Sequence, residues 1–286
     1  MDRKSTNQKE DSDNHINETG ENLAPRVKEF YDAFGKTFIR DLIRKNPRVT
    51  AVHRLFRQAI PAQAKSILVI GCGSGRDAWE LVKRVAPKAK VLAVDISENN
   101  IRIAETLFKH PRVKYKIIDI LEDDIEGTWQ YIVLPDVYEH IPKEHRSDLH
   151  IKLKRYLTHD GKIILTCPTP WHQQKLREAG EGLQIIDEDV FIEDIQSFAE
   201  AIGGFVGLYK TISIWNANDY FHAIIEKKSG LYMMNSSNYV AIKGNPRLSI
   251  GLRFWNAFRD RSKLRTIIRF IRRIRIEKKL RDANVF

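Results

Sequence analysis

The sequence predicts a doubly wound α/β protein with a mostly parallel sheet of seven strands and an antiparallel last strand. From residue 66 onward, short apolar runs alternate with helical patterns, a spacing typical of parallel strands joined by right-handed crossovers. The last two runs are separated only by "NAND" (216–219), and a link that short allows only a hairpin. One reversed strand is therefore expected at the edge of the sheet.

Apolar periodicity places each element along the chain. Pro47 breaks a helical pattern, and Ser97 is a suitable N-cap for the helix after the second strand. The turn "HDGK" (159–162) is expected to precede the fifth strand. Helices are predicted over 23–46, 49–60, 97–108 and 144–157. Two more are predicted to follow the first and fifth strands and to end near residues 85 and 203. Strands are predicted at 66–71, 91–95, 113–119, 131–135, 162–167, 208–215 and 220–227.

Composition divides the chain into four segments. Residues 1–22 are polar and predict a disordered N-terminus, and 23–62 predict a helical lid. Residues 63–228 form the predicted α/β core, and 229–286 form an extension that ends in a basic helix. The two cysteines make no disulfide framework or CxxC pair, and no signal peptide or spanning segment is evident, so a cytoplasmic protein is expected.

A glycine-rich turn follows the first predicted strand. Gly71, Gly73 and Gly75 have the spacing G-x-G-x-G at the start of a helix, where free backbone N–H groups bind ligands. The dinucleotide fingerprint requires a further small residue where this chain has Arg76, which argues against an NAD-dependent enzyme.

Two carboxylates follow the next two strands. Asp95 ends the second strand, where an acid can accept hydrogen bonds from both hydroxyls of a ribose. Asp119 ends the third strand, where it or the neighbouring backbone could accept from an adenine amino group. Each could instead be a helix N-cap or a solvated strand end, but three aligned strand ends favour a nucleoside site.

In order and spacing, "VIGCGSG", "AVDIS", "IIDI" and "IVLPDVYEHI" resemble the successive motifs of class I S-adenosylmethionine-dependent methyltransferases, a Rossmann-like family, from Ser66 to Lys227. The resemblance implies S-adenosylmethionine as the cofactor. Ile96 would pack on its adenine, and Tyr31, on the N-terminal helix, would close over its carboxylate. The other implied cofactor-binding residues are Gly71, Cys72, Gly73 and Gly75 at the methionine end, Asp95 on the ribose, Asp119 and Ile120 at the adenine edge, and Leu134 and Pro135 facing the sulfonium.

The stretch after the fourth strand holds the candidate catalytic residues. An oxygen acceptor must lose its proton, and His140 could be the general base, oriented by Glu139 or Asp136. The D-x-x-E-H pattern also resembles ubiquinone-pathway O-methyltransferases and small-RNA 2′-O-methyltransferases, in which such residues bind a divalent metal. Asp136 stands where those patterns usually have Glu, and His172 is a further metal candidate. Glu139 and His140 could alternatively cap the following turn.

Two further segments indicate what the protein could bind. Trp171 and His172, after the fifth strand, could line a polar acceptor pocket with one aromatic wall, which suits a sugar, or belong to an ordinary surface loop. The net charge is +11, and +9 of it falls in residues 251–286. Within 259–283, apolar residues recur at helical spacing among arginines, which predicts contact with an anionic membrane, a docked helix, or contact with nucleic acid. The apolar residues are Leu264, Ile267, Ile268, Ile271 and Ile274.

The sequence therefore predicts a cytoplasmic S-adenosylmethionine-dependent methyltransferase, peripheral at the inner membrane surface if the tail binds lipid. The expected reaction is O-methylation of a small hydroxylated acceptor: a saccharide, a lipid-linked intermediate or a secondary metabolite. Two alternatives stay open, an RNA methyltransferase and a non-catalytic cofactor-binding adaptor that acts through its basic tail. No RNA-binding module is recognisable in the sequence.

Overall fold

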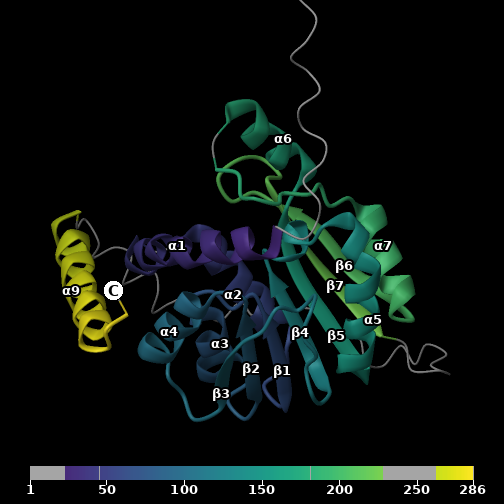
Figure 1. Cartoon of the computed structure of the whole chain (residues 1–286), viewed down its shortest axis with the longest axis horizontal. Helices are drawn as coiled ribbons and strands as arrows, with labels where there is room; N and C mark the ends of the chain where they lie inside the picture. Colours follow the sequence, from purple (N-terminus) through teal and green to yellow (C-terminus); the bar gives the residue numbers. More distant parts are fainter. Residues whose placement is uncertain (1–22, 45, 181, 228–261, 286) are drawn as a thin grey trace, which may run out of the picture.

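The computed structural model describes residues 23–44, 46–180, 182–227 and 262–285. Residues 1–22, for which the sequence predicts disorder, lie outside the described residues. So do residues 229–261, the first part of the predicted C-terminal extension. The described chain forms one twisted sheet with helices on both faces and a separate helix at the periphery (Figure 1).

The sheet has seven strands in the order β3-β2-β1-β4-β5-β7-β6. Only β7 runs antiparallel to its neighbours, and the other pairs are parallel, as the alternation of strands and helices predicts. The strands are β1 Ser66–Ile70, β2 Lys90–Asp95, β3 Val113–Ile117, β4 Trp129–Pro135, β5 Leu157–Pro168, β6 Gly204–Ile212 and β7 Tyr220–Lys227.

Two details differ from the sequence-based expectation. The reversed strand β7 lies inside the sheet, between β5 and β6, so that β6 is the edge strand. The predicted turn at 159–162 is part of β5, which begins at Leu157 and pairs with β4 across a register shift between Trp129 and Tyr131. An Asp-Gly pair is a common turn signal, but here the irregularity is absorbed within a continuous strand.

Helices cover both faces of the sheet. The helices are α1 Leu23–Arg44, α2 Pro47–Ala59, α3 Arg76–Glu80 with a π-helical turn Leu81–Val85, α4 Glu98–Leu107, α5 Arg146–Tyr156, α6 Pro170–Ala179, α7 Ile192–Ala201 and α9 Ser262–Asp282. Alternate residues of β1 divide between two cores because successive side chains point to opposite faces. Leu68 and Ile70 pack with α5 and α7, whereas Ile67 and Val69 pack with α2, α3 and α4.

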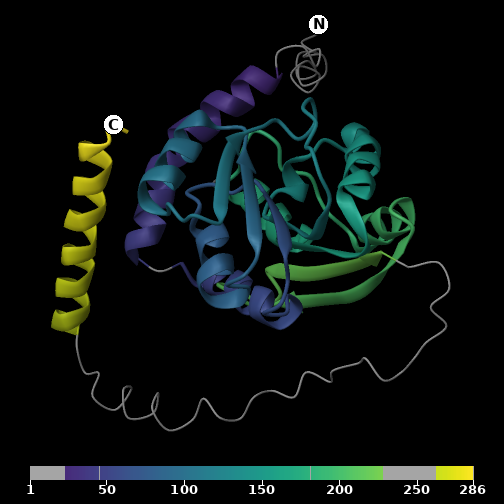
Figure 2. The ribbon, with the colours of Figure 1, turned by 90° about the horizontal axis from the view of Figure 1, so that it is seen from below.

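The predicted helix signals are confirmed at two N-termini. The Ser97 side chain accepts a hydrogen bond from the backbone N–H of Asn100, as the N-cap prediction requires. The break at Pro47 is also confirmed, although α2 begins at Pro47 itself, with Asn46 as an N-cap that the sequence reasoning did not single out. Asp32 of α1 accepts from Asn99 N–H at the start of α4. This contact fixes α1 across the sheet at the carboxyl ends of its strands (Figures 1 and 2).

Adding a side chain to the glycine at the start of α3 is expected to lower the stability of the fold. Gly75 has φ +81°, and an added Cβ would lie 2.6 Å from Cβ of Ala104 and 2.9 Å from the hydroxyl of Tyr115. Gly203 has a similar φ of +75° with no atom within 4 Å of its added Cβ. We expect Gly203→Ala to lower the free energy of unfolding by about 1 kcal/mol through backbone strain alone. Gly75→Ala should lower it by about 3 kcal/mol, because overpacking adds to the strain.

Urea unfolding of the two alanine variants beside the native chain measures this difference. Equal losses of stability for Gly75→Ala and Gly203→Ala would show that helix α4 and strand β3 do not constrain the turn.

The peripheral helix α9 packs on α1 and α4 through its C-terminal half. Leu280 and Val285 are buried against Ile103, with Ile276 and Leu107 packed beside them. The Arg102 guanidinium also donates a hydrogen bond to the carbonyl oxygen of Asn284. Among the described residues, no helix has the length and apolar character needed to cross a membrane.

Candidate functional site

A cavity of about 620 Å³ opens where the carboxyl ends of β1, β2, β3 and β4 meet. Residues of α1, of the first turns of α2 and of the loops after the strands line it. Figure 1 shows α1 lying across these strand ends. The volume of the cavity lies within the range of pockets that bind cofactors or small molecules. The sequence-predicted residues that line it are Tyr31, Gly71, Cys72, Gly73, Asp95, Ile96, Asp119, Ile120, Pro135, Asp136 and His140.

The glycine turn forms one wall of the cavity. Gly71 and Gly73 have positive φ, and a Cβ on Gly71 would lie 2.3 Å from a methyl carbon of Val137, so only glycine fits there. Gly75 is outside the lining: it packs beneath the turn and begins α3. Arg76 does line the cavity, and a bulky side chain therefore stands where a dinucleotide site needs a small one.

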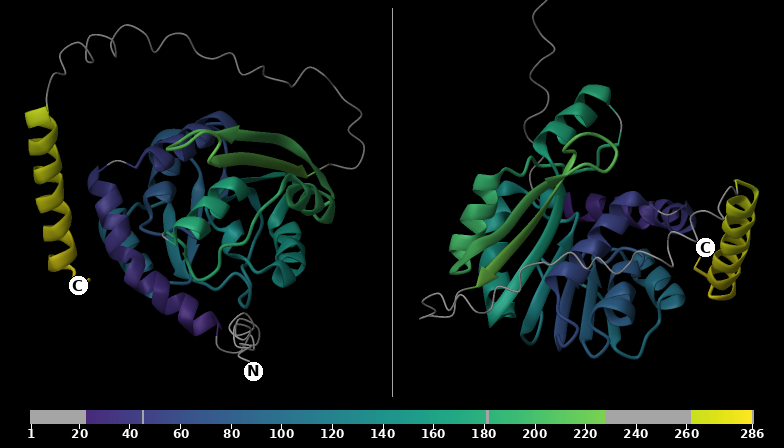
Figure 3. Two further views of the ribbon diagram at one scale, coloured as in Figure 1. Left: turned by 90° about the horizontal axis from the view of Figure 1, so that it is seen from above. Right: turned by 180° about the vertical axis from the view of Figure 1, so that it is seen from behind.

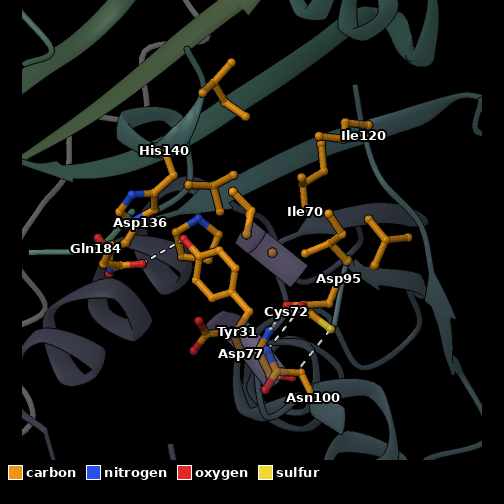
Figure 4. Close-up of a pocket in the computed structure, with 18 of the residues that line it drawn as sticks. Tyr31, Ile70, Cys72, Asp77, Asp95, Asn100, Ile120, Asp136, His140 and Gln184 are labelled. Atoms are coloured by element: carbon orange, nitrogen blue, oxygen red, sulfur yellow. Dashed lines mark hydrogen bonds between the residues drawn. The ribbon is translucent and has the colours of Figure 1, made fainter. Parts of the chain in front are cut away.

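Asp95 lies at the centre of this wall (Figure 4). Its Oδ2 accepts from Gly73 N–H at 2.7 Å, and its Oδ1 accepts from Ser97 N–H at 3.0 Å and Asn100 Nδ2 at 3.1 Å. Burial raises the pKa of Asp95, and these hydrogen bonds partly offset the rise. A carboxylate has about four acceptor sites, so Oδ2 keeps one for a ligand hydroxyl.

Asn100 is a site residue that the sequence reasoning missed. Its side chain is 1 % exposed and lines the cavity, and its Oδ1 has no hydrogen-bond partner among the described residues. A buried amide oxygen without a partner is costly unless a ligand or water donates to it. Its place one turn into α4, five residues after Asp95, was the available signal.

The second predicted carboxylate also reaches the cavity. Asp119 lines it directly after β3, and its Oδ1 accepts from Leu121 N–H at 2.9 Å. Ile96 and Ile120 are apolar lining residues on the same side as Asp95. This region can therefore hold a flat apolar group beside polar acceptors.

The end of β4 departs in part from the expectation. Leu134 is fully buried in the core between the sheet and its helices and does not line the cavity, whereas Pro135 does. The structure therefore does not bring the Leu134 side chain to the cavity, and a role of Leu134 in cofactor binding stays a prediction.

Tyr31 closes the cavity from α1. Its hydroxyl donates a hydrogen bond to Gln184 Oε1 at 2.7 Å, and its ring meets that of His140 edge-on at 6.2 Å between centroids. Figure 4 shows the Tyr31 ring between Asp95 and the pair formed by His140 and Gln184. Gln184, in the loop after α6, is a second residue that no sequence pattern marked.

Asp136 links β5 to α2 at the cavity. Its Oδ1 accepts from Thr166 Oγ at 3.0 Å, and its other oxygen pairs with the guanidinium of Arg48 on α2. Asp136 has φ +54°, a conformation that costs energy in a non-glycine residue and recurs at functional sites. The carboxylate is thus already engaged by two partners.

The geometry of His140 defines its protonation state. Its Nδ1 lies 2.6 Å from the backbone carbonyl oxygen of Ile186, and a carbonyl can only accept, so Nδ1 carries the proton. Burial lowers the pKa of His140 below its ordinary value of 6.5. The imidazole is therefore neutral at pH 7, and Nε2 presents a lone pair.

Glu139 is buried near the Nε2 edge of this imidazole and does not line the cavity. Its side chain is 2 % exposed, and its Oε1 is 3.8 Å from Nε2 of His140, too far for a hydrogen bond. Burial raises the pKa of Glu139 to about 7, and the thiol of Cys167 forms a hydrogen bond with it. The structure therefore does not place Glu139 in contact with a ligand.

The predicted acceptor residues after β5 lie elsewhere. Trp171 is 62 % exposed on α6, and neither it nor His172 lines the cavity. Trp215 and Tyr220 line it instead, with their rings edge-to-face at 5.8 Å. Buried Asp219 accepts from three consecutive backbone N–H groups at 2.7–2.9 Å and so fixes the turn that carries Trp215; these groups belong to Ile214, Trp215 and Asn216.

The metal candidates do not gather into a ligand set. Within the part of the chain that the structure describes, no group of three or more His, Cys, Asp or Glu side chains could hold a metal ion. The four candidates were Asp136, Glu139, His140 and His172. The Arg48 pair of Asp136 and the separate position of His172 explain why they do not converge.

Comparisons with known proteins agree with this geometry. Residues 67–161 match the family described as a methyltransferase domain. No curated protein is significantly similar to the sequence. Solved structures with the same fold include the DhpI–SAH complex, with a TM-score of 0.57, 13 % identity, and coverage of 74 % of this chain and 100 % of that one.

Two bacterial structures extend the comparison. A TehB-like SAM-dependent methyltransferase from Corynebacterium glutamicum gives a TM-score of 0.52 at 20 % identity, covering 71 % of this chain and all of that one. The N-methyltransferase NodS from Bradyrhizobium japonicum, in complex with S-adenosyl-L-homocysteine, gives 0.53 at 15 % identity, covering 67 % and 97 %. Residues 67–161 thus match a methyltransferase domain, and the chain has the Rossmann-like fold of these S-adenosylmethionine-dependent methyltransferases.

Proposed function

We propose that this chain transfers a methyl group from S-adenosylmethionine to an oxygen of a small hydroxylated acceptor, with His140 as the general base. The acceptor class is a saccharide, a lipid-linked intermediate or a secondary metabolite. The observation that carries the proposal is the neutral His140 imidazole, whose Nδ1–H donates to Ile186 and whose Nε2 is left to accept a proton. An oxygen acceptor needs such a base, because a hydroxyl is a poor nucleophile until its proton leaves.

The cofactor end of the cavity fits a nucleoside. Asp95 Oδ2 and the unpartnered Oδ1 of Asn100 are acceptors for the two ribose hydroxyls. Ile96 and Ile120 would flank the adenine, and Asp119 would accept from its amino group. The open backbone of Gly71 and Gly73 would receive the methionine portion, with Tyr31 above it.

Catalysis then depends on alignment and one proton transfer. S-adenosylmethionine supplies a methyl group on a positively charged sulfur, which leaves as a neutral thioether. Tyr31 and α1 cover the cavity and exclude water, which favours attack by the acceptor. His140 Nε2 takes the acceptor proton, and the Ile186 carbonyl stabilises the resulting imidazolium through Nδ1–H. Glu139 would help only by its charge near the Nε2 edge of the ring.

The acceptor end favours a polar ring. Trp215 and Tyr220 provide an aromatic wall, which suits the apolar face of a sugar. Arg48 supplies a cation at the same end, although Asp136 pairs with it. The finer resemblance to ubiquinone-pathway O-methyltransferases stays a prediction.

Transfer of labelled methyl from S-adenosylmethionine into extract of the source cells tests the proposal, with Asp95→Ala as the control. We expect label in the saccharide or lipid fraction, in a product whose methyl is bound to oxygen, and none with the control. Label in RNA or on nitrogen would contradict the acceptor assignment. Tight cofactor binding without transfer to any fraction would contradict the enzymatic role.

A further inference from the structure

Helix α9 has one face that docks on the protein and an opposite face that does not. Ile276 and Leu280 face α1 and α4, and Leu280 is only 3 % exposed. At 100° per residue, positions 271, 274 and 278 lie on the opposite side of the helix. In Figures 2 and 3 α9 is the outer edge of the described molecule, and no described element lies beyond it.

The outward side carries large apolar side chains that the fold leaves in solvent. Ile268, Phe270, Ile271 and Ile274 are each 45–62 % exposed, within seven consecutive residues. Ile271 and Ile274 are at the centre of the outward side, with Phe270 and Ile268 on its two flanks. A cluster of this kind on one helix marks an interaction surface rather than scattered surface residues.

Cations surround this apolar cluster. Between residues 268 and 282 there are seven Lys or Arg and two acidic residues. Among the described residues of the helix, one ion pair engages these cations, between Arg273 and Glu277. The cations with exposed side chains are Arg269, Arg273, Arg275, Lys278, Lys279 and Arg281.

We infer that the outward face of α9 docks on the surface of an anionic lipid bilayer. Ile271, Ile274 and Phe270 enter the boundary between headgroups and acyl chains, while arginine and lysine stems extend to the lipid phosphates. The docked half of the helix, anchored by Leu280 and by Val285 just after its end, fixes the protein body to that surface. The inference concerns where the enzyme acts and does not depend on the identity of its acceptor.

The chemistry of the face favours lipid over other partners. Nucleic acid is held by cations and by aromatic stacking, and exposed isoleucines contribute little to it. A second copy of this chain would bring seven cations against seven cations, an unfavourable pairing. An anionic bilayer satisfies both the apolar cluster and the charge around it.

Co-sedimentation of the full chain with vesicles tests this inference. Phosphatidylcholine vesicles with and without phosphatidylglycerol are compared at low salt and at about 0.5 M salt. We expect binding that requires the anionic lipid and weakens with salt. Ile274→Asp should lower the partition coefficient about tenfold or more, because it replaces inserted apolar surface with a charge of the wrong sign.

The matched control is Ile151→Asp on α5, which makes the same substitution at an exposed helical position outside α9. Its partition coefficient should stay within about twofold of the native value. Equal binding to neutral vesicles, or no effect of Ile274→Asp, would overturn the inference. So would RNA binding that Ile274→Asp leaves intact in a protein that ignores vesicles, or a dimer that Ile274→Asp dissociates.

Discussion

Replacing His140 with alanine is expected to lower kcat by about 10²- to 10⁴-fold, the usual contribution of a general base. The affinity for S-adenosylmethionine should change little, because the proposed cofactor contacts lie on the side of Asp95 and Asn100. His140→Gln should not rescue the rate: an amide can donate to the Ile186 carbonyl but cannot take a proton. Single-turnover kinetics with the identified acceptor, beside calorimetric binding of the cofactor, separate the two effects.

The pH dependence gives an independent check on the same residue. His140 acts as a base only when neutral, and burial lowers its pKa below 6.5. Activity should therefore persist at pH 6.5 and fall as the pH drops through the lowered pKa, since protonation removes the Nε2 lone pair. A profile whose acid limb lies well above pH 7 would contradict this assignment.

A second buried histidine provides the control. His222 on β7 is 8 % exposed, burial lowers its pKa to about 4, and it does not line the cavity. His222→Ala removes a neutral, buried imidazole from the same sheet, so its cost should fall on stability and leave kcat within about threefold. An equal loss of kcat in both variants would attribute the His140 effect to general disruption.

Most of the fold could be predicted from the sequence because its strands, helix boundaries and hairpin are each marked by residues close together in the chain. Apolar runs set the strands, Ser97 and Pro47 set helix boundaries, and the short "NAND" link required a hairpin. The position of β7 inside the sheet was not accessible, because a hairpin fixes the direction of a strand and not which of its two members reaches β5. The length of β5 depended on pairing with β4 across an irregular register, which no local pattern encodes.

The side of the cavity that we propose holds the cofactor could be predicted for a similar reason. Its residues follow strand ends, and the carboxyl ends of parallel strands meet at one edge of the sheet. The acceptor side could not, because its residues come from distant elements: Arg48 from α2, Gln184 from the loop after α6, and Trp215 from the β6–β7 turn. Trp171 is nearer in sequence to the predicted site than Trp215, yet it is directed into solvent.

Replacing Asp95 with alanine is expected to weaken S-adenosylmethionine binding about 10- to 100-fold, because the hydrogen bond from a ribose hydroxyl to its carboxylate is worth about 1.5–3 kcal/mol. The variant should also lose stability without ligand, since Gly73 N–H, Ser97 N–H and Asn100 lose their acceptor. Affinity is measured by calorimetry at a temperature where the variant is folded, and stability by urea unfolding.

A second buried carboxylate separates these two consequences. Asp219 also accepts three backbone N–H groups in a turn, but at the acceptor end of the cavity. Asp219→Ala should therefore lose comparable stability while its affinity for S-adenosylmethionine stays within about threefold of the native value. If both variants lost cofactor affinity equally, Asp95 would act by holding the glycine turn and not by binding the ribose. If neither lost it, the nucleoside would not bind at this strand end.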